Sequence, residues 1–255
     1  FAFLDRHLDR LRSAARATGI DIGPRSDLIE ALEATVARND MRDDVHVRLM
    51  ITRGDKKTPS QHPSNLVGGP NVVIIAEHKR ADPVVADRGI TLFTATIRRP
   101  PPDTLDQRLN CHSKLHEVIA LIQAVEAGAD EALMLDPTGA VATCNATNFF
   151  VVSRGEVLTS TGHYNLAGIT RAVILEQAAA AGLSTATRPF SLTDVYDAEE
   201  AFVTGTFGGL TPVTSVDGRI IGDGDVPGPA TRRLRRLYQR AVEADVEAQA
   251  GADRR

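Results

Sequence analysis

The sequence has few of the features that mark secreted or membrane proteins. Its 255 residues include two cysteines, Cys111 and Cys144, which are too few for a disulfide framework and favour a reduced, cytoplasmic protein. No apolar run approaches the ~20 residues of a membrane span, and no signal peptide opens the chain. The net charge of −4 provides no basic surface. We therefore expect neither a nucleic-acid partner nor a membrane partner.

Lysine is scarce as well. The 29 basic residues comprise 25 arginines and four lysines, which are Lys56, Lys57, Lys79 and Lys114. No lysine follows position 114. Chemistry that needs an amine nucleophile therefore has a short list of candidate residues.

What is present predicts a mixed fold with two domains. Apolar spacing and turn residues predict helices and strands that are intermixed without a βαβ period, which indicates the α+β class. The predicted helices are 1–18, 27–38, 114–127, 169–181, a short one from 191 and a last one from 229; the predicted strands are 45–52, 71–77, 90–96, 131–136, 148–153, 156–160 and 200–206. The proline run 100–102 predicts a boundary, with an N-terminal α/β domain at 1–99, a linker at 100–113 and a C-terminal domain at 114–255.

Lys114 stands at the predicted start of a helix, in the segment NCHSKLHEV. A surface lysine is the commonest explanation for such a residue. Two features favour a functional role instead: arginine supplies most other bases, and a helix start repels a cation. An amine in a positive, desolvated setting is neutral more readily, which suits a lysine that forms a Schiff base.

Two glycine-containing segments offer groups that bind phosphate. In LAGITRAVI (166–174), Gly168 precedes a predicted helix that begins with Ile169 and Thr170. Free N–H groups at a helix start bind phosphate, although ordinary helix capping gives the same pattern. In VTGTFGG (203–209), Gly205 and Thr206 suit a second phosphate contact, although a tight turn is the commoner explanation.

Other candidate residues are weaker. Arg10, in HLDRL (7–11), is by default an exposed arginine, and a bidentate phosphate partner is the alternative. Cys111, His112 and His116 lie close together, but no second ligand pair has metal spacing, so we predict no metal site. Cys144 has no histidine base in its own segment and is expected to be a small buried residue.

Together and in this order, HLDRL, a lysine after the proline run, GITR, FVTGT and DGRIIGDG resemble the class IV aminotransferases. These are the fold-type-IV PLP enzymes, which include branched-chain and D-amino acid aminotransferases, (R)-selective amine transaminases and aminodeoxychorismate lyase. The resemblance covers almost the whole chain. It implies a two-domain fold like that of D-amino acid aminotransferase, a homodimer, and pyridoxal 5'-phosphate (PLP) as cofactor.

The resemblance also implies roles for single residues. Lys114 matches the lysine that forms the aldimine with PLP and later moves a proton on the substrate. Leu166 matches the leucine that packs on a face of the pyridine ring. The phosphate is assigned to Arg10, Gly168, Ile169, Thr170, Gly205 and Thr206.

The chain departs from the family pattern in two places. Thr143 stands where the family usually carries a glutamate that hydrogen-bonds the pyridine nitrogen. A hydroxyl cannot hold a pyridinium as a carboxylate does, so the ring loses part of its strength as an electron sink. Asn145 is a further candidate donor to the cofactor. The family also has a strand region ahead of HLDRL, so we expect the natural chain to begin upstream of residue 1.

The expected activity is transfer of an amino group from an amino acid or primary amine to a 2-keto acid, through Lys114. Two alternatives stay open because of Thr143: a lyase of the aminodeoxychorismate lyase type, and a PLP-binding protein with weak or no transaminase activity. The loop after residue 52 lacks the Arg-x-His pair of D-amino acid enzymes and has Lys56, Lys57 and His62. Either lysine could bind a carboxylate, although exposed loop lysines are commoner, so the donor stays open.

Overall fold

The computed structural model describes residues 1–252, and its contacts divide the chain into two compact units. The smaller unit is Leu4–Arg80, and the larger comprises Phe1–Phe3 and the chain from Ala81 onward. The sequence places a boundary at the proline run 100–102, whereas the contacts place it after Arg80. The strand at 90–94 explains the difference, because it pairs on both sides with strands of the larger unit.

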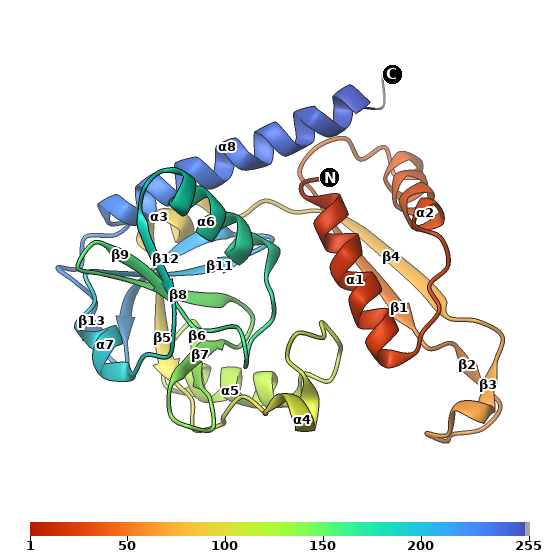
Figure 1. The fold of residues 1–255 in the computed structure, drawn as a ribbon, viewed down its shortest axis with the longest axis horizontal. Helices are drawn as coiled ribbons and strands as arrows, with labels where there is room; N and C mark the ends of the chain where they lie inside the picture. The colour runs from red at the N-terminus through yellow and green to blue at the C-terminus, as the bar shows by residue number, and fades with distance from the viewer. Residues whose placement is uncertain (253–255) are drawn as a thin grey trace. The chain divides into compact units, whose positions relative to one another are not determined.

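The smaller unit contains two helices and a long antiparallel hairpin (Figure 1). Leu28 and Leu32 are buried on the second helix, which packs on the second hairpin strand. The polar loop between the hairpin strands forms a two-stranded ladder and a short 3-10 helix. The elements are α1 (Leu4–Thr18), α2 (Arg25–Arg38), β1 (Val45–Thr52), β2 (Asp55–Lys56), η1 (Pro63–Asn65), β3 (Leu66–Val67) and β4 (Asn71–His78).

The larger unit is built on a mixed sheet that has nine strands among the described residues. Its order is β10-β9-β8-β11-β12-β5-β6-β7, with β13 paired to β12. The pairs β12/β5, β5/β6 and β9/β10 are parallel and the others antiparallel, which confirms the α+β class. The strands are β5 (Ile90–Thr94), β6 (Glu131–Leu135), β7 (Val141–Cys144), β8 (Asn148–Ser153), β9 (Glu156–Thr159), β10 (Ser184–Thr187), β11 (Glu200–Gly205), β12 (Gly209–Val216) and β13 (Arg219–Ile220).

Helices cover this sheet and bury its apolar side chains. Phe150 and Phe202 stack at 4.9 Å between ring centroids in a core that α6 and α8 cover, while Met134 packs in a separate core against α5. Figure 1 shows α8 running past α6. None of the described helices is long and apolar enough to cross a membrane. The helices are α3 (Pro83–Arg88), α4 (Pro102–Leu105), α5 (Leu115–Glu126), α6 (Ile169–Ala180), α7 (Leu192–Tyr196) and α8 (Pro229–Ala252).

The predicted elements are found with small shifts at their ends. The first helix begins at Leu4 rather than at residue 1, because Phe3 has a positive φ of 53° and packs on Tyr238. The capping box at Ser191 is confirmed, and so is the hairpin at Asp217-Gly218, where both residues have positive φ. The short elements β7, β10, α3 and α4 were not predicted.

Candidate active site

The start of α6 is fastened to the sheet by one asparagine. Asn148 opens β8 and stands opposite Thr204 of β11, so both side chains leave the same face of the sheet. Asn148 Nδ2 donates to the carbonyl oxygen of Leu166 at 3.1 Å. A Cβ on Gly168 would lie 2.1 Å from Asn148 Oδ1, so only glycine fits there without movement. The strand pairing therefore sets where α6 begins.

This arrangement gathers groups that suit a phosphate. Gly168 is the N-cap of α6, and no side chain of the described chain caps the helix there. The first N–H groups of a helix have no partner within it and point outward, which favours an anion. The hydroxyl of Thr204 is buried without a hydrogen-bond partner among the described residues, and β11 ends directly after it, at Gly205. We call Gly168–Thr170 and Thr204–Thr206 the α6 cradle.

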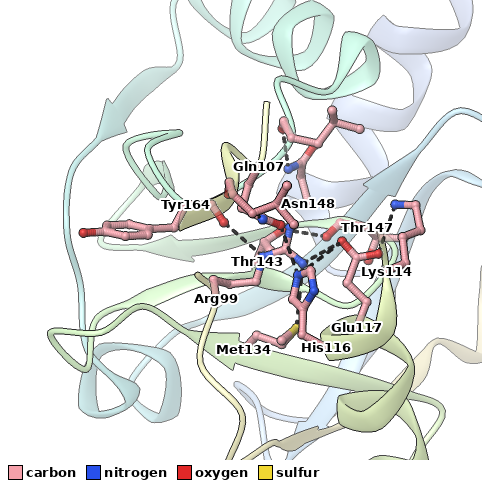
Figure 2. A network of polar contacts seen from close by, with 12 residues as sticks. Arg99, Gln107, Lys114, His116, Glu117, Met134, Thr143, Thr147, Asn148 and Tyr164 are labelled. Atoms are coloured by element: carbon pink, nitrogen blue, oxygen red, sulfur yellow. Dashed lines mark hydrogen bonds and ion pairs between the residues drawn. The ribbon is translucent and has the colours of Figure 1, made fainter. Parts of the chain in front are cut away.

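Lys114 lies directly before α5, as its N-cap residue. Its ammonium nitrogen is 3.0 Å from Oε2 of Glu117, one helical turn further on (Figure 2). The Lys114 side chain is 44% exposed and that of Glu117 is 12% exposed. The sequence argument expected a positive, desolvated setting. The structure corrects this, because a carboxylate in the first turn of α5 faces the amine and solvent reaches it.

The second oxygen of Glu117 binds a buried arginine. Oε1 of Glu117 is 2.8 Å from Nη1 of Arg99, whose side chain is 3% exposed. Arg99 Nε also donates to the carbonyl oxygen of Tyr164 at 3.1 Å. Burial lowers the pKa of Arg99, and the charge of Glu117 opposes that shift. Glu117 is thus the counter-ion of a guanidinium that has almost no contact with water, and we call Arg99, Lys114 and Glu117 the Lys114 cluster.

A pocket opens beside this cluster. Lys114 and Leu166 both line it, together with Arg99, Asn110 and Glu117. His116 lies at the edge of the cluster, where its Nε2 is 3.1 Å from Oε1 of Gln107 (Figure 2). Partial burial lowers the pKa of His116, and the nearby charge of Arg99 lowers it further.

The segment 164–168 joins the cluster to the cradle. Its first residue, Tyr164, accepts a hydrogen bond from Arg99, and Leu166 accepts one from Asn148. Two residues after Leu166 the backbone reaches Gly168 and enters α6. The structure therefore brings together, within the larger unit, most of the residues expected at the site: Lys114, Leu166, Gly168, Ile169, Thr170, Gly205 and Thr206.

Thr143 and Asn145 lie on the turn between β7 and β8. Thr143 is buried and its hydroxyl donates to the carbonyl oxygen of Thr147 at 2.7 Å. Asn145 Oδ1 accepts a hydrogen bond from the backbone of Ala132 at 2.8 Å, so this side chain serves the sheet. Cys144 is buried, as expected, and burial raises its pKa. Thr143 keeps free lone pairs but carries no charge.

Arg10 lies on α1, in the smaller unit, which the structure describes by itself. Burial lowers its pKa, and burial together with the charge of Arg10 lowers the pKa of His7 to about 4. The assignment of Arg10 to a phosphate stays a prediction. In the same unit, Lys56 and Lys57 are exposed, and Lys56 donates to the carbonyl oxygen of Ser60.

The sequence argument missed three residues of this region: Arg99, Glu117 and Asn148. Glu117 had a usable signal, because it follows Lys114 by three residues and so shares its helix face. Arg99 directly precedes the proline run, and Asn148 opens a predicted strand, but neither position identifies its partner.

Comparison with known proteins places the chain in a family. Residues 1–216 match the family described as amino-transferase class IV. A branched-chain-amino-acid aminotransferase-like protein 2 of Arabidopsis thaliana is 40% identical over 243 residues, which are 94% of this chain and 43% of that protein. A branched-chain-amino-acid aminotransferase of Pseudomonas aeruginosa is 33% identical over 97% of this chain and 80% of its own length. The chain thus spans less than half the length of the Arabidopsis relative.

Solved structures agree with these matches. A bacterial branched-chain amino acid aminotransferase, complexed with N-(5'-phosphopyridoxyl)-L-glutamate, superposes with a TM-score of 0.86. It is 29% identical, and the match covers 96% of this chain and 80% of that one. The fold, the order of the motifs and the extent of the family match agree: the chain belongs to the class IV aminotransferase family.

Proposed function

We propose that the protein is a PLP-dependent aminotransferase that moves an amino group from an amino acid or primary amine to a 2-keto acid. One observation carries the proposal: the pocket lined by Lys114 and Leu166 is joined to the α6 cradle by the short segment 164–168. An amine and a phosphate-binding helix start are the two groups that PLP requires of a protein. The phosphopyridoxyl compound in the superposed aminotransferase structure supports the choice of cofactor.

The residues present fit such a group at its phosphate end. Gly168 approaches Asn148 more closely than any side chain would allow, and the buried Thr204 hydroxyl has no partner among the described residues. Ile169, Thr170, Gly205 and Thr206 would complete the phosphate contacts, with Leu166 against the ring and Thr143 toward the ring nitrogen. When bound, the cofactor supplies an electron sink for negative charge on the substrate carbon.

The protein's own residues then have distinct tasks. Lys114 supplies the amine and is placed to take or return a proton at its Nζ. The start of α6 orients a dianion through its N–H groups and its dipole. The Thr143 hydroxyl has already given its proton to Thr147, so it can only accept a hydrogen bond and adds no negative charge. Leu166 excludes water from one side of the pocket.

Removal of the amine tests the proposal. We expect the purified protein to develop the visible absorbance of lysine-bound PLP, and Lys114→Ala to lose both this band and transamination. Lys79→Ala is the matched control, because Lys79 is similarly exposed and also pairs with a glutamate. D-alanine, L-leucine and (R)-1-phenylethylamine, each with a 2-keto acid, would identify the donor. A Lys114→Ala protein that keeps the band and the activity contradicts the assignment.

Thr143 favours a second candidate, a PLP-binding protein with weak or no transaminase activity. Its uncharged hydroxyl stabilises the electron sink less than a carboxylate would. Bound PLP that no donor amine converts would support this candidate, and a strong gain of rate in Thr143→Glu would show that the missing carboxylate limits the reaction. Release of pyruvate without a keto-acid acceptor would instead support a lyase of the aminodeoxychorismate lyase type.

We also propose a cytoplasmic homodimer, as the family resemblance implies. The exposed face of α5 supports an assembly, because it carries four apolar side chains at helical spacing: Leu115, Val118, Ile122 and Val125. Light scattering on the purified protein tests the dimer. A monomer at micromolar concentration contradicts it.

A further inference from the structure

Glu117 holds one cation with each of its two oxygens. Oε1 binds Arg99 at 2.8 Å, and Oε2 binds Lys114 at 3.0 Å. The first contact is almost fully buried, and Arg99 is further held by the carbonyl oxygen of Tyr164. A carboxylate fixed in this way cannot follow Lys114 if the lysine moves. Glu117 is therefore the fixed member of the pair, and Lys114, which is 44% exposed, is the mobile one.

We propose that Glu117 is a positioning residue for Lys114: anchored by Arg99, it holds the lysine ammonium at the mouth of the pocket lined by Leu166. The proposal rests on the proposed function insofar as it gives Lys114 a reactive role. The ion pair itself exists without cofactor and can be tested without it.

The surroundings of Lys114 show what Glu117 changes. Glu117 is the one carboxylate among the described residues that line the pocket. The other charged or titratable groups there are Arg99 and Cys111, and His116 lies 3.9 Å from Glu117 on the same helix. Without the carboxylate, Lys114 would face the charge of Arg99 and the positive end of α5. A carboxylate within hydrogen-bond distance instead favours the protonated, unreactive amine.

The chain offers a matched control pair. Lys79 lies 3.6 Å from Glu77, and both side chains are about half exposed, so solvent screens their attraction. Lys79 and Lys114 are exposed to nearly the same extent, at 47% and 44%. A difference in their amine reactivity therefore reports the buried anchor behind Glu117 rather than access of the reagent.

The test measures acetylation rates of single lysines in the cofactor-free protein between pH 6 and pH 10, by mass spectrometry of the peptides. We expect Lys114 to react several-fold more slowly than Lys79 at pH 7.5. Glu117→Gln should raise the Lys114 rate about tenfold and move its pH profile to lower pH, whereas Glu117→Asp keeps the charge and stays within about twofold. Glu77→Gln should change the Lys79 rate by less than about twofold.

Circular dichroism checks that each variant is folded. An unchanged Lys114 rate in a folded Glu117→Gln protein overturns the inference, whatever the cofactor does. If Glu117→Gln does not fold, the wild-type comparison decides: equal rates for Lys114 and Lys79 overturn the inference, and a slower Lys114 supports it. If the rate rises as expected while Lys114→Ala still shows the cofactor band, the ion pair stands and the proposed function loses its lysine.

Discussion

The α6 cradle and the Lys114 cluster solve two binding problems with different materials. The cradle uses backbone N–H groups, glycines and hydroxyls, whose places follow from strand pairing and from the start of one helix. The cluster uses three charged side chains, and each of them depends on the next for its charge balance. We therefore expect the cradle to tolerate changes of polarity but not added volume, and the cluster to tolerate changes of shape but not of charge.

The largest effect should come from removing the buried charge of the cluster. Arg99→Met leaves Glu117 nearly buried, with the exposed Lys114 as its remaining ion-pair partner. Breaking one side of a buried pair costs about 3–5 kcal/mol, so we expect a loss of this size in the free energy of unfolding, measured with urea. Arg188→Met is the control, because the Arg188–Glu156 pair at 2.9 Å lies near the surface and should cost less than about 1 kcal/mol. Equal losses would contradict the distinction.

Added volume should break the cradle. In Gly168→Ala the new Cβ would meet Asn148 Oδ1 at 2.1 Å, and relief requires either the Asn148–Leu166 hydrogen bond or the start of α6 to move. We expect a loss of about 1–3 kcal/mol in stability. PLP should bind at least about tenfold more weakly, since about 1.4 kcal/mol corresponds to tenfold in affinity. A spectrophotometric PLP titration measures the affinity.

Gly205→Ala is the matched control for that change. A Cβ on Gly205 would meet Thr147 Cγ2 at 3.5 Å, an ordinary contact, in the same cradle. We expect PLP affinity and stability close to those of the unchanged protein. If both variants lose affinity alike, chemistry at the cradle, rather than space, sets the tolerance.

These two regions also differ in how much the sequence reveals. The start of α6 was predicted because it depends on local signals: apolar spacing fixes the helix, and Gly168 marks its beginning. The cluster depends on contacts between residues far apart in sequence, such as Arg99 with Tyr164. Lys114 was noted as unusual at a helix start, but its neutralisation by Glu117 needs both side chains in place. A pattern of single residues does not contain that information.

The same reasoning explains the differences in the fold. Strands β8 and β11 were predicted because their apolar runs are long, whereas β7 and β10 have four residues each and too little pattern to detect. The proline run 100–102 looked like a boundary, but the pairing of β5 with β6 and β12 places residues 90–94 in the larger unit. Sheet partners, not local stiffness, decide to which unit a strand belongs.

The smallest effect is a difference in pH dependence. Burial and Arg99 lower the pKa of His116 from 6.5, so in the folded cluster the ring stays neutral to lower pH than in the unfolded chain. As the pH falls below 6.5 the unfolded state takes up the proton first, and stability is lost from there down to the lowered pKa. His116→Gln removes this contribution, so the variant should lose less stability than the unchanged protein between about pH 7 and pH 5. The cradle has no titratable side chain, and Gly205→Ala should therefore follow the slope of the unchanged protein. His7, whose pKa is also lowered, is present in all three proteins and cancels in the comparison. Urea denaturation across this pH range measures the slopes, and identical slopes for His116→Gln and Gly205→Ala would show that the cluster is no more sensitive to pH than the cradle.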